Sequence, residues 1–390
     1  MNILILSFYY APDLCAGSFR CTAFVEALRK QAHRDTQIDV LTTAPNRYAS
    51  FDGVASALEE QPGLKIERIT LPKHQSGMLD QAKAFVAFAF KVNQRIKCRE
   101  YDLVFATSSR LMTAALGAWI AHRKKAKLYL DIRDLFTDTI QDVLPRKLSM
   151  ILKPIFSCIE KKSIGLAQQV NLVSRGFEGY FREHHPYANL SWFTNGIDSE
   201  FLAPPKLEHL DVVSSMPVTV LYAGNIGEGQ GLHTIIPDLA KRMEGRLRFK
   251  IIGDGGRKTH LINALHQAQC NNVELISPLS RAELIAEYQR ADILFLHLND
   301  YEAFRKVLPS KIFEYAAMGK PIWAGISGYA AAFVCSEICN AAIFYPCDAA
   351  EAETVFSRLK RRNNTRLAFI EKYKRSHIMD NMASNMLNLL

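Results

Sequence analysis

The amino-acid sequence predicts an α/β protein with two doubly wound, Rossmann-like domains built on parallel sheets. The chain has 390 residues, about twice the usual size of one domain, so two buried cores are expected. Short apolar runs alternate with helical patterns from end to end, which is typical of parallel sheets with helices on both faces. Several of these runs lead through a glycine-bearing loop into a helix, and ligands bind at such loops in open parallel sheets.

Each half of the sequence holds enough apolar runs for one sheet. In the first half we predict strands at residues 2–7, 38–42, 65–69, 103–106, 127–131, 169–173 and 191–193. In the second half we predict strands at residues 218–222, 248–252, 273–276, 293–297, 321–324 and 342–345.

These strands define the expected domains. The N-terminal domain should span residues 1–200 and the C-terminal domain residues 217–373, and a helix near 374–390 is expected to pack back on the first domain. The stretch 201–217 contains three prolines and mixed charges, which indicates a linker.

The composition is that of a folded protein with an anionic partner. Hydrophobic residues make up 48% of the chain and charged residues 22%, as in ordinary globular domains. The net charge is +9, and positive charge concentrates in the apolar-rich stretches 81–99 and 146–162. Neither stretch has the aromatic and glycine signature of a nucleic-acid module, so no nucleic acid is expected as partner.

The N-terminus and the cysteines point to a cytoplasmic protein. The first residues begin a strand with no basic leader before it, which argues against a secretory signal. The eight cysteines include no Cys-x-x-Cys pair and lie among apolar neighbours. We expect buried free thiols rather than disulfides or a metal site.

The first candidate site is the loop that follows the first strand. Ala16 and Gly17 would let backbone N–H groups approach an anion at the N-terminus of the next helix. Arg20 is expected one turn into that helix, on the side of the site. An ordinary glycine-containing turn is the alternative interpretation.

A richer loop follows the first strand of the second half. Residues 222–231 hold four glycines, including Gly224 and Gly227, with Asn225 between these two. A flexible backbone of this kind at a helix N-terminus suits a pyrophosphate. The turn at Gly253 and Asp254, which ends the next strand, is expected to line the same site.

The segment 308–321 carries the most specific pattern. Ser310 is a candidate N-cap, and Gly319 ends the short helix that follows it. Lys311 and Glu314 are three residues apart, so they should project from one face of its first turn. The lysine can neutralise phosphate, and the carboxylate can accept hydrogen bonds from a ribose diol. A solvated ion pair is the alternative.

Together these segments resemble the retaining glycosyltransferases of family 4, in which two Rossmann-like domains face each other across a cleft in the GT-B arrangement. The matching segments keep the family's order and spacing over essentially the whole chain: the Gly17 loop, 195–198, 222–225, 252–255, 288–293 and 309–321. The segments 7–12 and 131–134 are most similar to the branch that builds bacterial surface polysaccharide, including the N-acetyl-L-fucosaminyltransferases of O-antigen assembly.

Two places depart from the family pattern. Many members carry an arginine after the glycine of the second loop and a lysine before its last glycine, where this sequence has Asn225 and Gln230. Of two glutamates that the family spaces eight residues apart, only Glu314 is present, because Lys306 stands at the first position. We expect Lys311, together with Arg305 and Lys306, to supply the missing positive charge beside the diphosphate.

The acceptor is expected on the first domain. The resemblance implies that Asp131, Arg133, Asp134 and Asp138, which follow the strand 127–130, lie where family members bind acceptor, and Asp131 is a candidate catalytic residue. A salt-bridged strand end is the alternative interpretation.

No cofactor and no metal are expected. No cluster of His, Cys or Asp has the spacing of metal ligands. The pair His184-His185 precedes Pro186 and is expected to be a solvated loop pair. The charge of a leaving group must then be balanced by lysines, arginines and helix N-termini.

The resemblance implies transfer of a sugar, an N-acetylated deoxysugar carried on UDP, to a polyprenyl-diphosphate-linked saccharide with retention of anomeric configuration. The basic apolar stretch 144–156 has the composition of an interfacial segment on an anionic membrane, and no run reaches the roughly 18 apolar residues that span a bilayer. A peripheral protein on the cytoplasmic face of the inner membrane fits both observations.

Two other functions stay open. One is a sugar-nucleotide 2-epimerase of the same architecture, which would need acid and base residues at the sugar and no acceptor surface. The other is a non-catalytic nucleotide-binding subunit, which Lys306 in place of the first glutamate makes conceivable.

Overall fold

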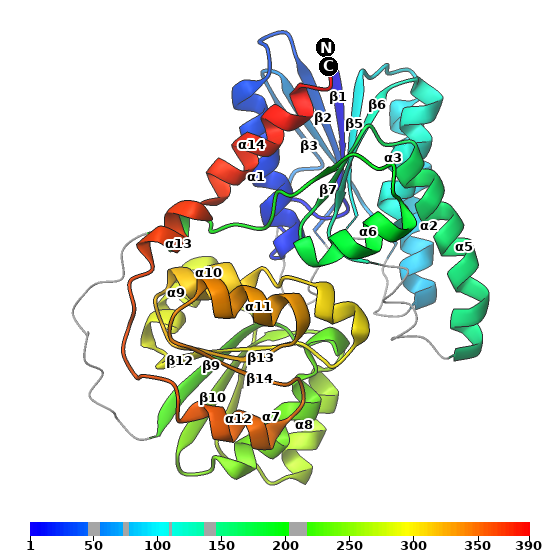
Figure 1. Ribbon diagram of the computed structural model, residues 1–390. Coiled ribbons are helices and arrows are strands. Elements are labelled where there is room, and N and C mark those ends of the chain that lie inside the picture. Colours follow the sequence, from blue (N-terminus) through cyan, green and yellow to red (C-terminus); the bar gives the residue numbers. More distant parts are fainter. Residues whose placement is uncertain (46–54, 73–77, 109–110, 136–145, 203–216) are drawn as a thin grey trace. The chain divides into compact units, whose positions relative to one another are not determined.

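The fold is described from a computed structural model that places residues 1–45, 55–72, 78–108, 111–135, 146–202 and 217–390 (Figure 1). These residues form two compact units. Unit 1 comprises Met1–Asn195 with Ser376–Leu390, and unit 2 comprises Gly196–Arg375. Most of the expected linker and the candidate acceptor residue Asp138 lie outside the described residues.

Unit 1 is built on an eight-stranded sheet in the order β3-β4-β2-β1-β5-β6-β7-β8. Its strands are β1 Asn2–Leu6, β2 Gln37–Thr43, β3 Leu58–Gln61, β4 Leu64–Ile69, β5 Leu103–Thr107, β6 Lys127–Ile132, β7 Gln169–Leu172 and β8 Leu190–Ser191. All pairs are parallel except β3 with β4. The apolar runs are buried on both faces, as parallel sheets require.

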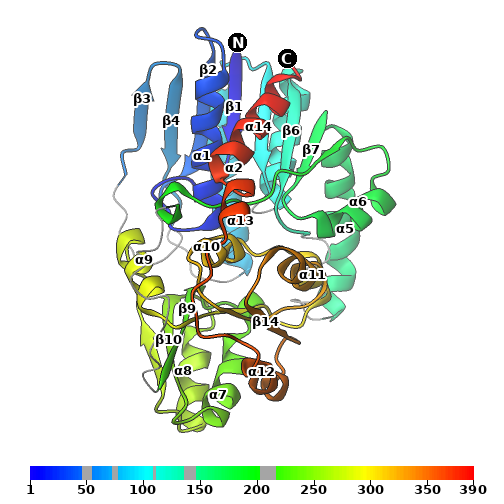
Figure 2. The ribbon, with the colours of Figure 1, turned by 60° about the vertical axis from the view of Figure 1, so that its left-hand side comes forward.

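Helices cover both faces of this sheet. They are α1 Ala16–Gln31, α2 Met78–Ile96, α3 Leu111–Lys124, α5 Arg146–Gly165, α6 Glu178–His184 and α14 Arg375–Leu387. Helices α1 and α14 lie side by side and share one core with Ile3 and Ile5 of β1 (Figures 1 and 2). Side chains alternate between the two faces along a strand, so Phe8 points to the other face. There its ring packs against Phe88 of α2, with 5.4 Å between the ring centroids.

Unit 2 is a six-stranded parallel sheet in the order β11-β10-β9-β12-β13-β14. Its strands are β9 Val218–Asn225, β10 Leu247–Asp254, β11 Val273–Ile276, β12 Ile293–His297, β13 Ile322–Gly325 and β14 Ala341–Phe344. Its helices are α7 Leu232–Arg242, α8 Lys258–Gln267, α9 Arg281–Arg290, α10 Lys311–Ala317, α11 Gly328–Glu337, α12 Ala349–Phe356 and α13 Leu367–Lys372. Every strand predicted from the sequence overlaps a strand of the two sheets, which confirms the predicted fold class.

The structure corrects two expectations. Strand β3 was not predicted because Leu58-Glu59-Glu60-Gln61 has a single apolar residue. It forms as an exposed antiparallel edge strand through the turn at Gly63, whose φ is 72°. All eight cysteines are free thiols, as predicted, but burial was wrong for most of them: only Cys21 is buried, and Cys98, Cys158, Cys335 and Cys339 are exposed.

No helix of the described residues is both long enough and apolar enough to cross a membrane.

Candidate active site

The carboxyl ends of β9 and β10 form an unusually close backbone surface in unit 2. Gly224 and Gly253 are paired across the two strands, and both have φ near 150°, where side chains are strained. A Cβ atom added to Gly253 would lie 1.8 Å from the carbonyl oxygen of Gly224. Only glycine therefore fits there, and the strand ends expose peptide groups rather than side chains.

Lys311, the first residue of α10, reaches across this surface. A Cβ atom on Gly224 would lie 2.3 Å from Lys311 Cε and 3.0 Å from Nζ, so the glycine makes room for the lysine. Burial lowers the pKa of Lys311, Glu314 raises it and Arg281 lowers it further. Within the part of the chain that the structure describes, no hydrogen bond or salt bridge engages Nζ. This ammonium group therefore has no counter-charge in direct contact within the described residues, and an anion at Gly224 would supply one.

Glu314 lies in a buried cluster with Tyr288 and Arg281. Its side chain accepts a hydrogen bond of 3.3 Å from Tyr288 and lies 3.9 Å from Arg281, and the residue is 7% exposed. Arg281 also pairs with Asp198, which in turn pairs with Arg375. The solvated ion pair of Lys311 with Glu314, the alternative left open by the sequence, is not formed. Lys311 and Glu314 are three residues apart on α10, as expected, but their side chains have different contacts.

Asn225 and Gln230, the two residues that depart from the family pattern, contact each other. Asn225 Nδ2 donates to Gln230 Oε1 at 2.8 Å, which closes the loop over Gly227. A neutral amide pair thus occupies the position where many family members have two cations. Lys311 is left as the cation nearest to Gly224.

The other expected contributors from unit 2 differ in placement. Arg305 pairs with Glu302 at 2.9 Å and Asp300 at 3.5 Å, and donates to Tyr345 Oη at 2.9 Å. Its guanidinium group is therefore already paired with two carboxylates, and its expected role beside a diphosphate stays a prediction. Lys306 ends the short 3₁₀ helix Glu302–Lys306, which also contains Arg305.

Two further predicted residues border loops, one before a helix and one at the end of a strand. Ser310 precedes α10, but its side chain makes no capping hydrogen bond, so the predicted N-cap interaction is absent. Asp254 ends β10, accepts from the backbone N–H of Gly255 at 2.9 Å and lies 3.9 Å from Lys258.

His297 is a structural residue of this site that sequence reasoning missed. It ends β12 and is fully buried. Its Nδ1 lies 2.7 Å from the carbonyl oxygen of Gln230, and its Nε2 lies 2.9 Å from the backbone N–H of Cys347. A neutral ring that donates from Nδ1 and accepts at Nε2 satisfies both contacts. Burial lowers the pKa of His297 to about 4. The only sequence signal was a polar residue at the end of an apolar strand.

In unit 1, Arg20 and Asp131 form a buried ion pair with two hydrogen bonds, of 2.9 and 2.8 Å. Arg20 also donates to the carbonyl oxygens of Phe193 and Thr194, and Asp131 accepts from Asn171. Burial alone would raise the pKa of Asp131, but the Arg20 guanidinium holds it below its usual range. The two side chains are 2% and 1% exposed and form the salt-bridged strand end that we gave as the alternative, and their expected binding and catalytic roles stay predictions.

Arg133 and Gly17 are brought together at the N-terminus of α1. A Cβ atom on Gly17 would lie 2.4 Å from Arg133 Nη1, so the guanidinium covers this glycine. The sequence placed both residues in a binding site but gave no sign that they touch, because they are far apart in the chain.

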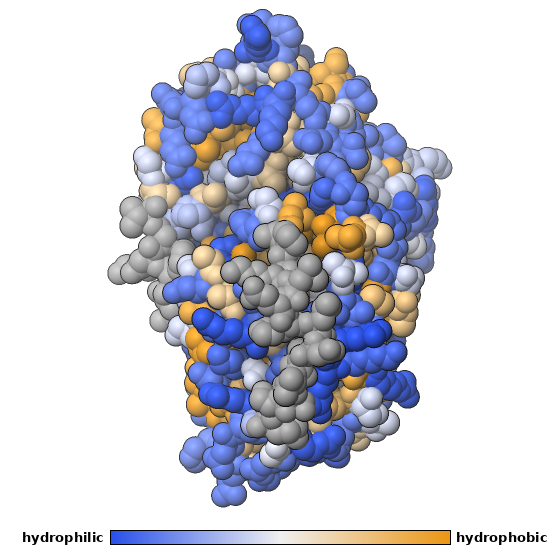
Figure 3. Space-filling model, turned by 90° about the vertical axis from the view of Figure 1, so that its left-hand side faces the viewer, coloured by the Kyte–Doolittle hydropathy of each residue, from blue (hydrophilic) through white to orange (hydrophobic). Residues whose placement is uncertain are grey.

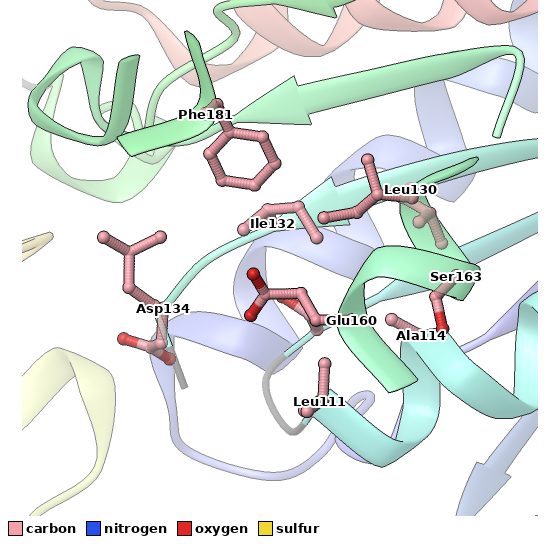
Figure 4. Close-up of a pocket in the computed structure, with 11 residues that line it drawn as sticks. Leu111, Ala114, Leu130, Ile132, Asp134, Glu160, Ser163 and Phe181 are labelled. Carbon is pink, nitrogen blue, oxygen red and sulfur yellow. The ribbon is translucent and has the colours of Figure 1, made fainter. Parts of the chain in front are cut away.

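Asp134 lines a small pocket in unit 1 (Figure 4). The walls are mainly apolar side chains from α3, β6 and α6, among them Leu111, Ile132 and Phe181. Glu160 of α5 also lines it and is hydrogen-bonded by Tyr180 at 2.6 Å.

His185 contacts the same carboxylate of Glu160 at 3.1 Å, and its side chain is only 7% exposed. The expected solvated histidine pair is therefore wrong for His185, although His184 is half exposed. No group of three or more His, Cys, Asp or Glu side chains that could hold a metal ion occurs among the described residues.

Comparisons with known proteins identify the family. The family model "Glycosyl transferases group 1" matches residues 212–376, which include the Gly224 loop and Lys311. The protein named "Putative colanic acid biosynthesis glycosyl transferase WcaI" of Escherichia coli (strain K12) is 32% identical over 343 residues, which is 82% of each chain.

Solved structures share the fold over the full chain. Sucrose-phosphate synthase from Thermosynechococcus elongatus aligns with a TM-score of 0.77 at 13% identity, over 100% of this chain and 99% of that one. Anabaena Alr3699/HepE in complex with UDP and glucose aligns with a TM-score of 0.69 at 17% identity, over 100% of both chains. WaaG, a glycosyltransferase involved in lipopolysaccharide biosynthesis, aligns with a TM-score of 0.69 at 11% identity, over 98% of this chain and 99% of WaaG.

The chain therefore belongs to the glycosyl transferases group 1 family, and it is a glycosyltransferase with two Rossmann-like domains of the GT-B type.

Proposed function

We propose that this enzyme transfers a sugar from a UDP-sugar to a lipid-linked saccharide during synthesis of a bacterial surface polysaccharide, with retention of anomeric configuration. The observation that carries the proposal is Lys311 Nζ, which lies beside Gly224 at the carboxyl edge of the sheet of unit 2 and, among the described residues, makes no hydrogen bond or ion pair. Helix N-termini and exposed peptide groups at such an edge favour the phosphates of a nucleotide.

The comparisons support this assignment. WcaI carries colanic acid biosynthesis in its name, and WaaG is involved in lipopolysaccharide biosynthesis. HepE was solved with UDP and glucose bound. An N-acetylated deoxysugar as donor sugar and a polyprenyl-diphosphate carrier are further parts of the proposal, and an anionic membrane surface would hold such an acceptor.

The reaction needs charge stabilisation more than a protein nucleophile. The bond between the anomeric carbon and the β-phosphate oxygen breaks, and an acceptor hydroxyl oxygen forms the new bond on the same face. The departing phosphate oxygen takes the acceptor proton. Negative charge grows on the diphosphate as it leaves, and Lys311 is placed to stabilise it in a site from which water is partly excluded. No cofactor or metal is part of this proposal.

Nucleotide binding tests the site directly. We expect calorimetry to detect UDP binding to the wild-type protein. In Lys311→Ala, the affinity for UDP should fall more than the affinity for a UDP-sugar, because the terminal phosphate of free UDP carries the charge that transfer releases. Lys241→Ala is the matched control, since Lys241 lies in the same unit and pairs with Glu244 at 2.9 Å. Absence of UDP binding by the wild-type protein, or equal losses in both variants, would show that Lys311 does not mark the donor site.

A further inference from the structure

Two tyrosines of unit 2 carry their hydroxyl groups into the interior. Polar side chains lie mainly at the surface of a folded protein, and the face of the molecule in Figure 3 is mostly hydrophilic. Tyr288 of α9 and Tyr315 of α10 are instead fully buried, and their rings meet edge to face with 5.4 Å between the centroids. A buried hydroxyl group is stable only where it is hydrogen-bonded, so its partner shows what the side chain holds in place.

Tyr315 satisfies a backbone group where two strands separate. Strand β9 stays paired with β10 to its last residue, but its pairing with β12 ends at Leu221. Peptide groups along a strand alternate between its two neighbours, and Thr219 accepts a hydrogen bond from the residue before β12, so Ala223 also turns towards β12. There the backbone N–H of Ala223 donates to Tyr315 Oη at 3.2 Å. The tyrosine hydroxyl therefore takes the place of the strand that has moved away.

This opening lies where the strand order of the sheet reverses. The chain runs from β9 to β10 and β11 on one side and then crosses to β12 on the other side of β9. Ligands of open parallel sheets bind in the crevice at such a point. Ala223 directly precedes Gly224, whose missing side chain leaves room for Lys311. The hydroxyl group of Tyr315 thus fixes the backbone that borders the proposed phosphate position.

Tyr288 holds the carboxylate of Glu314. Its hydroxyl group donates to Oε2 at 3.3 Å, and Arg281, the first residue of the same helix α9, lies 3.9 Å from Oε1. Each oxygen therefore has a partner on α9, and an ionised carboxylate keeps further lone pairs for a diol. Burial raises the pKa of both Tyr288 and Tyr315, and the nearby Glu314 carboxylate raises it further. Both hydroxyl groups keep their protons, so the donor to Glu314 is always present.

We propose that Tyr288 and Tyr315 are positioning residues of the donor site. Tyr315 orients the peptide groups beside the phosphates, and Tyr288 orients Glu314 towards the ribose diol. Because both hydroxyl groups are buried, they act through these neighbours and not on the nucleotide itself. The contact between the two rings keeps the phosphate part and the ribose part of the site in register. The proposal rests on the proposed function, in which unit 2 binds a UDP-sugar.

Binding of UDP and of uridine, measured by ligand-observed NMR, tests Tyr315. Tyr315→Phe keeps the ring but removes the acceptor for the Ala223 N–H, so affinity for UDP should fall about tenfold. Affinity for uridine, which has no phosphate, should stay unchanged. Hydrogen exchange of the segment that contains Ala223 should become faster even without nucleotide. Wild-type affinity for UDP in the variant, or equal losses for both ligands, would overturn the role of Tyr315.

A double-mutant cycle tests Tyr288. Tyr288→Phe should raise KM for the donor about tenfold and change kcat little, because it loosens a charged group that binds ribose. In the Glu314→Gln background the same change should have no further effect on KM, since both substitutions remove one contact. Additive losses would show that Tyr288 only supports the fold, and an unchanged KM in the single variant would equally contradict its positioning role.

Tyr373→Phe is the matched control. Tyr373 is also buried in unit 2, and its ring packs on α10 against Phe313 with 5.3 Å between the centroids. This variant should bind UDP and use the donor like the wild type, and losses as large as those of the other two would contradict the proposal. The two ideas fail separately. No UDP binding by the wild type would contradict the donor site itself, whereas UDP binding that Lys311→Ala weakens and both tyrosine variants leave unchanged would contradict only the positioning role.

Discussion

At the scale of single residues, the proposed reaction depends on Lys311, which would stabilise the charge of the leaving diphosphate. Because the charge on the diphosphate grows during transfer, the interaction with Lys311 should be stronger in the transition state than with bound donor. Lys311→Ala should therefore lower kcat by about 100-fold to 1000-fold and raise KM for the donor by much less. Steady-state kinetics at saturating acceptor measure both constants. A change confined to KM would mean that Lys311 only binds the donor.

Glu314→Gln should give a different pattern. A carboxylate that holds a ribose diol acts about equally in ground and transition states, so donor KM should rise while kcat changes little. The structure adds a second effect, because Glu314 is buried beside Arg281 and Tyr288. The free energy of unfolding of the variant should be about 1 kcal/mol lower than that of the wild type, and a lower melting temperature would detect this. An unchanged melting temperature together with unchanged KM would place Glu314 outside the site.

Contacts between individual residues were the part of the structure that the sequence predicted least well. The loops with Gly224, Gly253 and Lys311 could be predicted. Glycines at strand ends allow the backbone to approach a ligand closely, and a lysine beside them supplies a positive charge. The pairing of Arg20 with Asp131 could not be predicted, since the two residues are 111 positions apart and meet only when α1 packs on the sheet. The contact of Arg281 with Asp198 could not be predicted either, because these residues are 83 positions apart in the chain.

At the scale of elements, the meeting of β9 and β10 depends on glycine. Gly253→Ala would place a Cβ atom against the carbonyl oxygen of Gly224 at a φ of 152°, so it should cost about 3 kcal/mol or more of unfolding free energy. Gly165→Ala, at the end of α5, meets no atom within 4 Å and should stay within about 0.5 kcal/mol of the wild type. Denaturant unfolding of both variants measures the difference, and equal stability of the two would contradict the close approach of the strands.

His297 connects the end of β12 to the Gln230 loop and to Cys347, and it should make stability depend on pH. Its pKa is lowered to about 4 in the folded state against 6.5 in the unfolded chain, so below pH 6.5 the unfolded state binds the proton first. The stabilisation is complete above pH 6.5 and should be lost by about 3 kcal/mol as the pH falls towards 4. Unfolding of the wild type and of His297→Gln across this range isolates the effect. Parallel curves for the two proteins would argue against a neutral buried ring.

The elements themselves were largely predictable. Parallel strands buried on both faces produce continuous apolar runs, and these runs marked every strand of the two sheets except β3. That strand is stabilised by pairing with β4 at an exposed edge rather than by burial, so its sequence carries no such run. The same limit applies to α2, because a sequence shows an amphipathic helix but not which of its apolar residues, here Val86 and Phe90, stay exposed.

At the scale of the whole molecule, the strand and loop pattern was enough to predict two Rossmann-like units and a glycosyltransferase. The helix expected near 374–390 is α14, and it packs on α1 in unit 1 through Met379, Met382 and Met386. The proposed transfer to a lipid-linked acceptor is a property of the whole chain, so it is tested in the intact enzyme.

The most direct measurement of the central claim is mass spectrometry of products after incubation of the enzyme with UDP-sugars and a bacterial lipid extract, in the presence of a chelator. We predict release of UDP and addition of one sugar to a lipid-linked saccharide by the wild type, with the product strongly reduced in Lys311→Ala. An epimerised nucleotide sugar without lipid product, or nucleotide binding without any turnover, would contradict the proposed transfer.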